Sequence, residues 1–419
     1  MRNDFVKRYD VVVAGGGVAG VAAALAASRR GAKVALIEKT VLWGGLATAG
    51  IIFIYLPLCD GNGTQVTFGI SEELLKAGLK YGPGEIPAGW QTGENLAEEK
   101  RYRVIFSPAS MVLGIDELLE ASGCDLWLDT QLIDAETRDG RVTSVTVANK
   151  SGTGRLEAAA FVDATGDADL AFFAGAECPT MANALASWSL EYCTQPGGHP
   201  FAPGIRASII GCSTDPDFTE PGVNGRMVSD FLLAGRAGYR KMLDDAYASG
   251  ASDRFTRFPL KLPAMPDLRH TRRIDGVSTL PPGMEWKPFE DSIGVCADWR
   301  CSGKVWELPF STLLPKTLSN VLAAGRCISS TGDAWEVTRV IPVAALTGEA
   351  AGIAAALSAE RCISAHELPV SDVQDAMVNL LIAKLEKRPL PTGAIDLKVQ
   401  MVIRKSVSDR NQKKQGETL

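Results

Sequence analysis

The stretch that decides the fold is Tyr9-Asp10-Val11-Val12-Val13-Ala14-Gly15-Gly16-Gly17-Val18-Ala19-Gly20. It runs into the alanine-rich residues 21–27, and Lys33-Val34-Ala35-Leu36-Ile37-Glu38-Lys39 follows. Each short, continuous apolar run is typical of a strand buried on both faces. The alanine-rich part is long enough for a helix, and Gly31 is placed to cap its end. We therefore expect a strand–helix–strand unit with its glycines in the first turn.

The glycines of that turn have the spacing of a dinucleotide-binding motif. Gly15 allows a tight turn, Gly17 lets a pyrophosphate approach the backbone, and Gly20 lets helix and strand pack closely. The N–H groups and the dipole at the start of the helix favour phosphate. Glu38 follows Gly17 at about the 20-residue spacing of the acid that binds a ribose hydroxyl. The alternative is a glycine-rich structural turn followed by a chance acidic residue.

Length and composition limit the class of protein. A chain of 419 residues predicts two or three domains, and 46% hydrophobic with 22% charged residues is typical of a soluble globular protein. The net charge of −6 gives no electrostatic reason to expect nucleic acid or an anionic membrane as partner. Three His argue against a His-rich metal site, and nine scattered Cys without a C-x-x-C pair indicate neither a zinc site nor a redox dithiol. No secretory signal precedes the first strand, so we expect a cytoplasmic protein with reduced thiols.

The next part of the chain continues the pattern of a nucleotide-binding fold. Residues 43–50 include Gly44-Gly45, which predict either backbone packed against a ligand or a flexible loop. Helices are expected over 71–81 and 108–122, and a small antiparallel β-meander over 125–147. A strand over 156–162 ends in Asp163-Ala164-Thr165-Gly166-Asp167, and strand ends are where nucleotides bind in doubly wound sheets.

The second half predicts an insertion followed by a return to the first domain. Alternation weakens over 175–300, where we expect helices over 183–192 and 226–248 in a substrate or cap domain. A buried strand then ends at Gly325, and Pro342 fits the first position of a helix over 343–357. The predicted domains are 1–174 with 301–362 for the nucleotide, 175–300 for the cap, and 363–419 for C-terminal helices and a polar tail.

Taken in order, these pieces resemble the glutathione-reductase-type FAD-dependent oxidoreductases. Within them, the chain is similar to the bacterial family whose members are often labelled xanthan lyases. The resemblance covers residues 9–358 and rests on the first glycine turn and on five further motifs: Gly44-Gly45 with Thr48, residues 163–167, Thr271-Arg272-Arg273-Ile274, residues 324–329 with Arg339, and residues 348–352. It implies an α/β fold with a discontinuous, Rossmann-like FAD-binding domain, a β-meander and an inserted cap domain.

The resemblance implies non-covalent FAD with its ribose on Glu38, its adenine near Leu132, and its ribityl chain near Gly325. The helix from Pro342 would point its N-terminus at the isoalloxazine, where its dipole stabilises negative charge on reduced flavin. The expected FAD-binding residues are Gly15, Gly16, Gly17, Val18, Ala19, Gly20, Glu38, Lys39, Gly44, Gly45, Leu46, Ala47, Thr48, Leu132, Ala164, Thr165, Gly166, Asp167, Gly325, Arg326, Val340, Val343 and Ala344.

Two positions depart from the family pattern. Arg326 replaces the acidic ribityl ligand of related flavoproteins, and Gly332 stands where many relatives have His. No second nucleotide-binding motif is visible, so NAD(P)H would bind transiently or a partner protein would supply electrons. A homodimer is the family expectation.

The expected reaction is hydride transfer between FAD and a small polar or anionic organic substrate. We expect Arg272, Arg273 and Arg339 to line the substrate side of the flavin, because arginine binds oxygen groups through a rigid fork. The proton carrier would be His270, since histidine titrates near neutral pH, or Glu336, if burial raises its pKa. In the alternative reading, Arg272 and Arg273 join the cap to the FAD domain by salt bridges. Two other functions stay open: a lyase, hydratase or isomerase with a flavin that is not net redox-active, and an electron-transfer subunit.

Overall fold

The predicted strand–helix–strand unit forms the centre of the larger sheet. The structure, a computed structural model, describes residues 5–62, 64–87, 103–182, 185–195, 199–213 and 222–385. β1 (Phe5–Ala14) leads into α1 (Val18–Arg29), and the chain returns as β2 (Val34–Ile37). The two strands pair in parallel, with Val11 opposite Val34 and Ala14 opposite Ile37. All four residues of β2 are buried, as the apolar run predicts.

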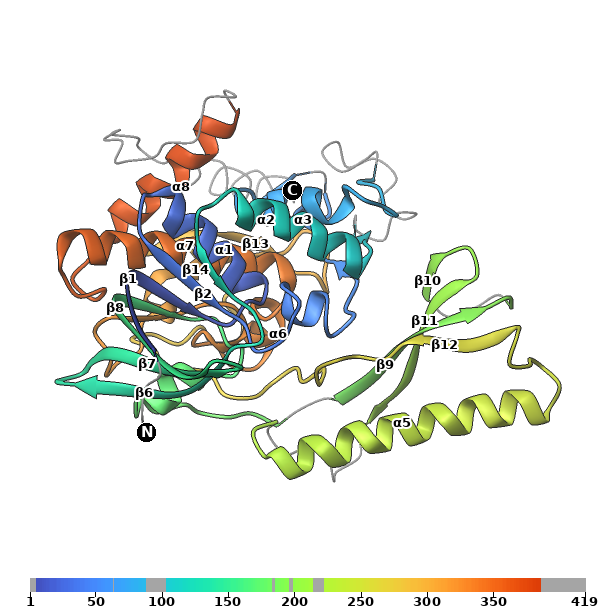
Figure 1. Ribbon diagram of the computed structural model, residues 1–419. Helices are drawn as coiled ribbons and strands as arrows, with labels where there is room; N and C mark the ends of the chain where they lie inside the picture. Colours follow the sequence, from blue (N-terminus) through green and yellow to red (C-terminus); the bar gives the residue numbers. More distant parts are fainter. Residues whose placement is uncertain are drawn as a thin grey trace, which may run out of the picture.

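The larger sheet has seven strands in the order β5-β2-β1-β8-β7-β6, and the seventh, β15, pairs with β8 (Figure 1). The remaining strands of this sheet are β5 (Asp125–Trp127), β6 (Gln131–Arg138), β7 (Arg141–Asn149), β8 (Gly152–Asp163) and β15 (Val321–Ala323). β15 joins in parallel although it lies far from β8 in the sequence, so the nucleotide-binding fold is discontinuous, as predicted.

The predicted β-meander over 125–147 is correct for β6 and β7, which pair antiparallel, and the separately predicted strand β8 joins them antiparallel to β7. The meander prediction is wrong for residues 125–129. β5 instead pairs in parallel with β2 and extends the nucleotide-binding sheet. The reason is the connection: α3 precedes β5 and returns the chain to the sheet edge, as a crossover between parallel strands does.

Helices cover the larger sheet, and two of these helices pack closely against each other. The helices of this unit are α2 (Ile70–Leu79), α3 (Pro108–Glu120), α4 (Asp169–Phe173), α6 (Asp333–Thr338), α7 (Ile341–Arg361) and α8 (Val370–Leu385). α2, α3 and α7 confirm the predicted helices. A Cβ atom on Gly352 of α7 would lie 2.2 Å from the Ala23 carbonyl oxygen of α1, so these helices touch backbone to backbone. α7 has the length and apolarity of a membrane span, but its most apolar window is 94% buried, as in the core helix of a folded domain.

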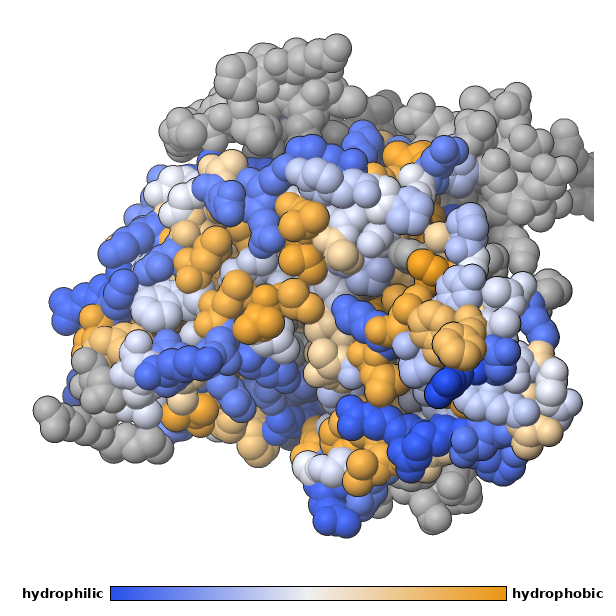
Figure 2. Space-filling model, turned by 45° about the vertical axis from the view of Figure 1, so that its right-hand side comes forward, coloured by the Kyte–Doolittle hydropathy of each residue, from blue (hydrophilic) through white to orange (hydrophobic). Residues whose placement is uncertain are grey.

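A smaller unit projects from the larger one and forms the inserted cap (Figure 1). It is a four-stranded antiparallel sheet in the order β10-β11-β9-β12, packed against the long helix α5. Its elements are β9 (Leu185–Cys193), β10 (His199–Ala202), β11 (Ile205–Ser213), α5 (Gly225–Ala248) and β12 (Arg257–Lys261). On the face that Figure 2 shows, hydrophobic residues form separate patches among hydrophilic ones, which is ordinary for a protein surface.

The predicted helix over 226–248 is confirmed as α5, whereas the predicted helix over 183–192 is wrong, because this stretch forms β9. β9 pairs with β11 on one side and β12 on the other. Leu190 packs in a small apolar cluster with Ile51 and Phe53, while its neighbour Glu191 bonds to Tyr239 of α5. This alternation of faces is that of a strand in a half-polar sheet. Residues 183 and 184 and the predicted polar tail lie outside the described residues.

Two two-stranded antiparallel sheets complete the fold, and the second is a hairpin. β3 (Ile54–Tyr55) pairs with β4 (Val104–Ile105), and β13 (Ser292–Ala297) pairs with β14 (Val305–Pro309). The loop between β13 and β14 reaches α6. There, Trp299 Nε1 donates to the carbonyl oxygen of Glu336 at 3.0 Å, and Arg300 pairs with Asp333 at 3.2 Å. This hairpin therefore braces the short helix that carries Glu336.

Candidate active site

A cleft lies along the carboxyl ends of the parallel strands β1, β2, β8 and β15. It starts at the β1–α1 turn and reaches the N-terminal end of α7. Its lining residues are Gly15, Gly17, Val18, Ala19, Ile37, Glu38, Lys39, Gly44, Gly45, Leu46, Ala47, Thr130, Gln131, Leu132, Ala164, Thr165, Gly166, Asp169, Met265, Ala324, Gly325, Arg326, Arg339, Ile341 and Ala344. Strand ends of this kind are the ligand-binding edge of open α/β sheets.

The first glycine turn has the geometry that its spacing predicts. Gly15 has φ +100°, and a Cβ there would lie 2.4 Å from the carbonyl oxygen of Ala164. A Cβ on Gly20 would lie 1.7 Å from the carbonyl oxygen of Gly15, so only glycine fits where α1 crosses the strand ends. A Cβ on Gly17, in contrast, would meet nothing within 4 Å. Gly17 caps α1 without any side-chain hydrogen bond, and it faces open space in the cleft.

Glu38 holds this turn and also lines the cleft. Its Oε2 accepts a hydrogen bond from the backbone N–H of Gly16 at 2.8 Å, and its Oε1 accepts one from Thr40 at 2.7 Å. The side chain is fixed by these two bonds, and each carboxylate oxygen keeps a further lone pair. Glu38 is thus able to accept hydrogen bonds from a ligand hydroxyl without any change of rotamer.

Most of the predicted FAD-binding residues line this cleft, but six do not. Those six are Gly16, Gly20, Thr48, Asp167, Val340 and Val343. They support the lining instead: Gly16 packs against the Trp43 ring, Thr48 donates to the carbonyl oxygen of Trp43, and Val343 is buried in the first turn of α7.

The cleft also contains residues that sequence reasoning missed. They are Ile37, Thr130, Gln131, Asp169, Met265, Ala324 and Ile341. Six of them lie within two residues of a predicted position, so a wider window around each motif finds them. Met265 has no such signal, because it reaches the cleft on the chain segment that returns from the cap.

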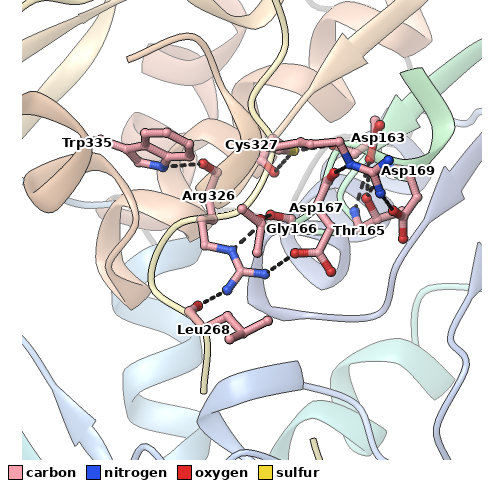
Figure 3. Close-up of polar contacts among 12 residues, drawn as sticks. Asp163, Thr165, Gly166, Asp167, Asp169, Leu268, Arg326, Cys327 and Trp335 are labelled. Carbon is pink, nitrogen blue, oxygen red and sulfur yellow. Dashed lines mark hydrogen bonds and ion pairs between the residues drawn. The ribbon is translucent and has the colours of Figure 1, made fainter. Parts of the chain in front are cut away.

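Arg326 lines the cleft, and its guanidinium joins three parts of the site (Figure 3). It donates to the carbonyl oxygen of Gly166 at 2.9 Å, pairs with Asp167 at 2.6 Å and donates to the carbonyl oxygen of Leu268. Trp335 Nε1 holds the backbone by donating to the Arg326 carbonyl oxygen at 2.8 Å. Arg326 therefore fixes the end of β8 and the cap's return segment to the cleft wall.

Arg272 and Arg273 do not line the cleft. Arg272 pairs with Asp169 at 2.6 Å, donates to the carbonyl oxygen of Asp167 at 3.0 Å and stacks over the Phe172 ring at 4.1 Å. Arg273 donates to Ser329 Oγ at 3.1 Å. These contacts favour the reading in which the two arginines join the cap's return segment to the FAD domain. Burial, with the neighbouring acids, raises the pKa of Asp169 to about 6 against the lowering effect of Arg272.

Arg339 lines the cleft and belongs to a chain of polar side chains with Glu336 and His270. Arg339 Nε donates to Glu336 Oε2 at 3.1 Å, and His270 Nε2 lies 2.9 Å from Glu336 Oε1. On the other side of the ring, His270 Nδ1 lies 3.2 Å from the carbonyl oxygen of Ala182. Burial raises the pKa of Glu336, but the bond to His270 and the charge of Arg339 outweigh burial and bring the pKa to about 2.

The direction of this pKa shift decides whether Glu336 can carry a proton. A proton carrier at Glu336 requires a pKa raised by burial, whereas here the pKa is lowered. Glu336 is therefore a fixed anion at neutral pH that orients Arg339 and His270. Burial also lowers the pKa of Arg339 from its ordinary value, with Glu336 opposing the change.

The residues of the cleft fit a flavin dinucleotide. The open face of Gly17 with the uncapped N-terminus of α1 suits a pyrophosphate, and Glu38 suits a ribose. At the other end, α7 begins at the cleft with Ile341 and Ala344, and its first turn has no side-chain cap. A helix N-terminus there favours a group that becomes negative on reduction.

Comparisons with known proteins agree with this geometry. The family model described as FAD dependent oxidoreductase matches residues 10–189 and 207–377. No curated protein sequence matches the chain.

Three solved structures with a similar fold have low sequence identity to the chain. A geranylgeranyl bacteriochlorophyll reductase-like protein from Thermoplasma acidophilum is 14% identical, with a TM-score of 0.47 over 91% of this chain and 84% of that one. OxyS anhydrotetracycline hydroxylase from Streptomyces rimosus is 13% identical, with a TM-score of 0.49 over 89% and 66%. CabE, an aromatic hydroxylase from angucycline biosynthesis, is 13% identical, with a TM-score of 0.47 over 97% and 72%. At these values they carry no argument about activity.

The family match spans well over half of the chain and includes both parts of the discontinuous fold that forms the cleft. The chain therefore belongs to the family of FAD-dependent oxidoreductases.

Proposed function

We propose that this FAD-dependent oxidoreductase moves a hydride between non-covalent FAD and a small polar or anionic organic substrate. FAD, when bound, supplies the site for the hydride. The observation that carries the proposal is the continuity of the cleft, from the open face of Gly17 to the guanidinium of Arg339. The first end suits the dinucleotide, and the second places a cation beside the start of α7, where the reacting ring would lie.

The residues divide into roles along the cleft. Glu38 and Gly17 would hold the ribose and the pyrophosphate, with Leu132 near the adenine. Gly325 would lie by the ribityl chain, and Arg326 would fix the wall rather than bind that chain. We propose the whole predicted set of residues as FAD contacts. We also propose that the chain is related to the glutathione-reductase-type flavoproteins and to the family labelled xanthan lyases.

At the reacting end, Arg339 would bind an oxygen of the substrate. Its pairing with Glu336 offsets part of its charge, so a polar group or a single carboxylate suits it better than a polyanion. The cap formed by β9–β12 and α5, within the predicted range 175–300, would supply specificity. The electron donor or acceptor would be transient NAD(P)H or a protein, and we propose a cytoplasmic location and a homodimer.

The second candidate is a lyase, hydratase or isomerase in which FAD is not net redox-active. One experiment separates the two. The purified protein is mixed anaerobically with single metabolites, and the visible flavin spectrum is recorded while product is assayed. Bleaching of the flavin by a substrate, or recolouring of the reduced protein by its product, supports the oxidoreductase. Product formation with an unchanged spectrum, in the absence of an added electron donor, supports the second candidate.

A further inference from the structure

The guanidinium of Arg339 has one edge bound to the protein and another edge free. Its Nε and Nη2 both donate to Glu336 Oε2, at 3.1 and 2.5 Å. Nη1 makes no hydrogen bond or ion pair with any described residue, and it is not among the buried polar atoms that lack a partner. Nη1 is therefore accessible, and Arg339 lines the cleft.

The free donors match a carboxylate. An arginine has five N–H groups in a rigid plane, and the contact with Glu336 leaves Nη1 and the outer N–H of Nη2. These two groups run parallel, as the two oxygens of a carboxylate require for a two-point pair. A single hydroxyl or ketone oxygen would use only one of them well. The free edge of Arg339 is thus suited to an organic acid.

The charges around Arg339 also favour an anion at this edge. Burial lowers the pKa of Arg339, and Glu336 opposes the change. The positive charges of Arg269 and Arg326 lower this pKa further, so the three guanidinium groups repel one another. An anion bound to Nη1 reduces that repulsion.

The rest of this end of the cleft is apolar. Leu46, Met265, Ile341 and Ala344 are half-buried, and all four line the same cleft as Arg339. Met265 enters from the cap side, on the segment whose Ala264 N–H donates to the carbonyl oxygen of Ala49 at 2.8 Å. A ligand with an apolar body covers these side chains and removes apolar surface from water, which is favourable.

We propose that the reacting end of the cleft binds a monocarboxylate with an apolar body. The two carboxylate oxygens accept from the free edge of Arg339, and the body packs against Met265. This inference rests on the proposed function and names the class of its substrate. Glu336 contributes to the choice, because its fixed negative charge opposes a second carboxylate on the same ligand.

The test is a binding titration of the FAD-loaded protein, which needs no turnover. The probes are benzoate, its neutral amide benzamide, and acetate, and calorimetry gives the affinities. Benzoate should bind at least about tenfold more tightly than benzamide, the lower range for hydrogen bonds to a charged group. It should also bind at least about tenfold more tightly than acetate, which has no apolar body. Hexanoate and hexanamide repeat the comparison with a flexible body; if neither acid is preferred to its amide, the inference is overturned.

Variants separate the two parts of the site. Arg339→Lys should keep its FAD and lower the benzoate-to-benzamide ratio of affinities about threefold or more, because lysine keeps the charge but loses the fork. Met265→Ala should weaken both probes about threefold or more and leave their ratio unchanged. Arg8→Lys is the matched control, because the Arg8 side chain is 82% exposed and pairs with Glu157. An unchanged ratio in Arg339→Lys would show that FAD, not substrate, covers Nη1 and would overturn the inference.

Failure of this inference can be told from failure of the proposed function. Bleaching of the flavin by a metabolite, in a protein that does not prefer acids to amides, overturns the carboxylate class and leaves the hydride transfer intact. Preference for acids, in a protein that forms product with an unchanged flavin spectrum, overturns the proposed function and supports the carboxylate site.

Discussion

The carboxylate of Glu38 both holds the first glycine turn and faces the cleft. It holds the backbone of the first glycine turn through Gly16 and Thr40, and it faces the cleft. Hydrogen bonds to charged groups contribute about 1.5–3 kcal/mol each. We therefore expect Glu38→Ala to weaken FAD binding by about tenfold or more, measured by fluorescence titration of the FAD-free protein. Glu120→Ala, at the exposed end of α3, should bind FAD like the wild type; equal affinity of both variants would contradict the role of Glu38.

The three arginines predicted at the substrate side have different surroundings, so replacing each by lysine should distinguish a role in the reaction from a role in stability. Arg339→Lys should keep its FAD and slow flavin reduction by about tenfold, which is about 1.4 kcal/mol of transition-state stabilisation. Arg272→Lys should keep the reduction rate and lower the melting temperature, because lysine loses the fork to Asp167 and Asp169 and the stacking on Phe172. Arg273→Lys should also keep the rate. Stopped-flow absorbance measures the rate of flavin reduction, visible absorbance the flavin content, and thermal unfolding the melting temperature. A wild-type reduction rate in Arg339→Lys would contradict the position of Arg339 beside the reacting atoms.

Among the helices, α1 and α7 pack with no room for a side chain between them. Gly348 and Gly352 face the carbonyl oxygens of Ala19 and Ala23, where a Cβ would lie 2.1 and 2.2 Å away. Gly352→Ala should destabilise the protein by about 1–3 kcal/mol through overpacking, more than the gain of about 1 kcal/mol in helix propensity. Chemical denaturation measures the difference. Gly225→Ala, at the start of α5 where a Cβ meets nothing, should be neutral or stabilising.

The cap is held together by a buried carboxylate on β9. Glu191 Oε1 accepts from Arg206 at 2.8 Å and Ser208 at 2.6 Å, and its Oε2 accepts from Tyr239 at 2.9 Å and Arg257 at 3.2 Å. Burial raises the pKa of Glu191, but the bonds from Ser208, Arg206 and Arg257 outweigh burial and lower it. These partners come from β11, α5 and β12, so Glu191 connects its own strand to three other elements of the cap.

Glu191→Gln should cost about 3–5 kcal/mol, because it leaves Arg206 and Arg257 buried without a counter-charge. A lowered carboxyl pKa stabilises the fold above the unfolded pKa, and that stability is lost as pH falls through the folded pKa. The wild-type protein should therefore lose stability in acid, whereas Glu191→Gln should lose less over the same range. Thermal unfolding from pH 7 to pH 3 tests this, with Glu120→Gln as the surface control; identical profiles for the two variants would refute it.

Elements whose signals are local are predictable from the sequence, and those set by distant partners are not. β1, α1 and α7 follow from apolar runs, glycine spacing and the position of Pro342. β9 does not, because its alanine, leucine and glutamate residues suit a helix, and only pairing with β11 and β12 makes it a strand. Likewise, the glycine turn of the site is predictable, whereas Met265 reaches the cleft only through the return of the chain from the cap.

At the scale of the molecule, the cap is attached beside the cleft. Lys261 Nζ, at the end of β12, donates to the carbonyl oxygen of Thr48 at 3.3 Å, and the N–H of Ala264 donates to the carbonyl oxygen of Ala49 at 2.8 Å. Thr48 and Ala49, which follow the cleft-lining residues 45–47, are therefore bonded directly to the chain that leaves the cap. A substrate held by the cap would lie close to the reacting end of the cleft.

If this cleft holds FAD, Gly17→Val should abolish FAD binding without unfolding the protein. Gly17 has φ −65° and ψ 177°, which valine adopts freely, and its Cβ position is open. The variant should therefore fold with the melting temperature of the FAD-free wild type, while its side chain fills the space of the pyrophosphate. The measurement is the flavin content of both purified proteins by visible absorbance after incubation with FAD. We predict about one FAD per chain in the wild type and almost none in Gly17→Val; equal flavin content in two folded proteins would contradict the account.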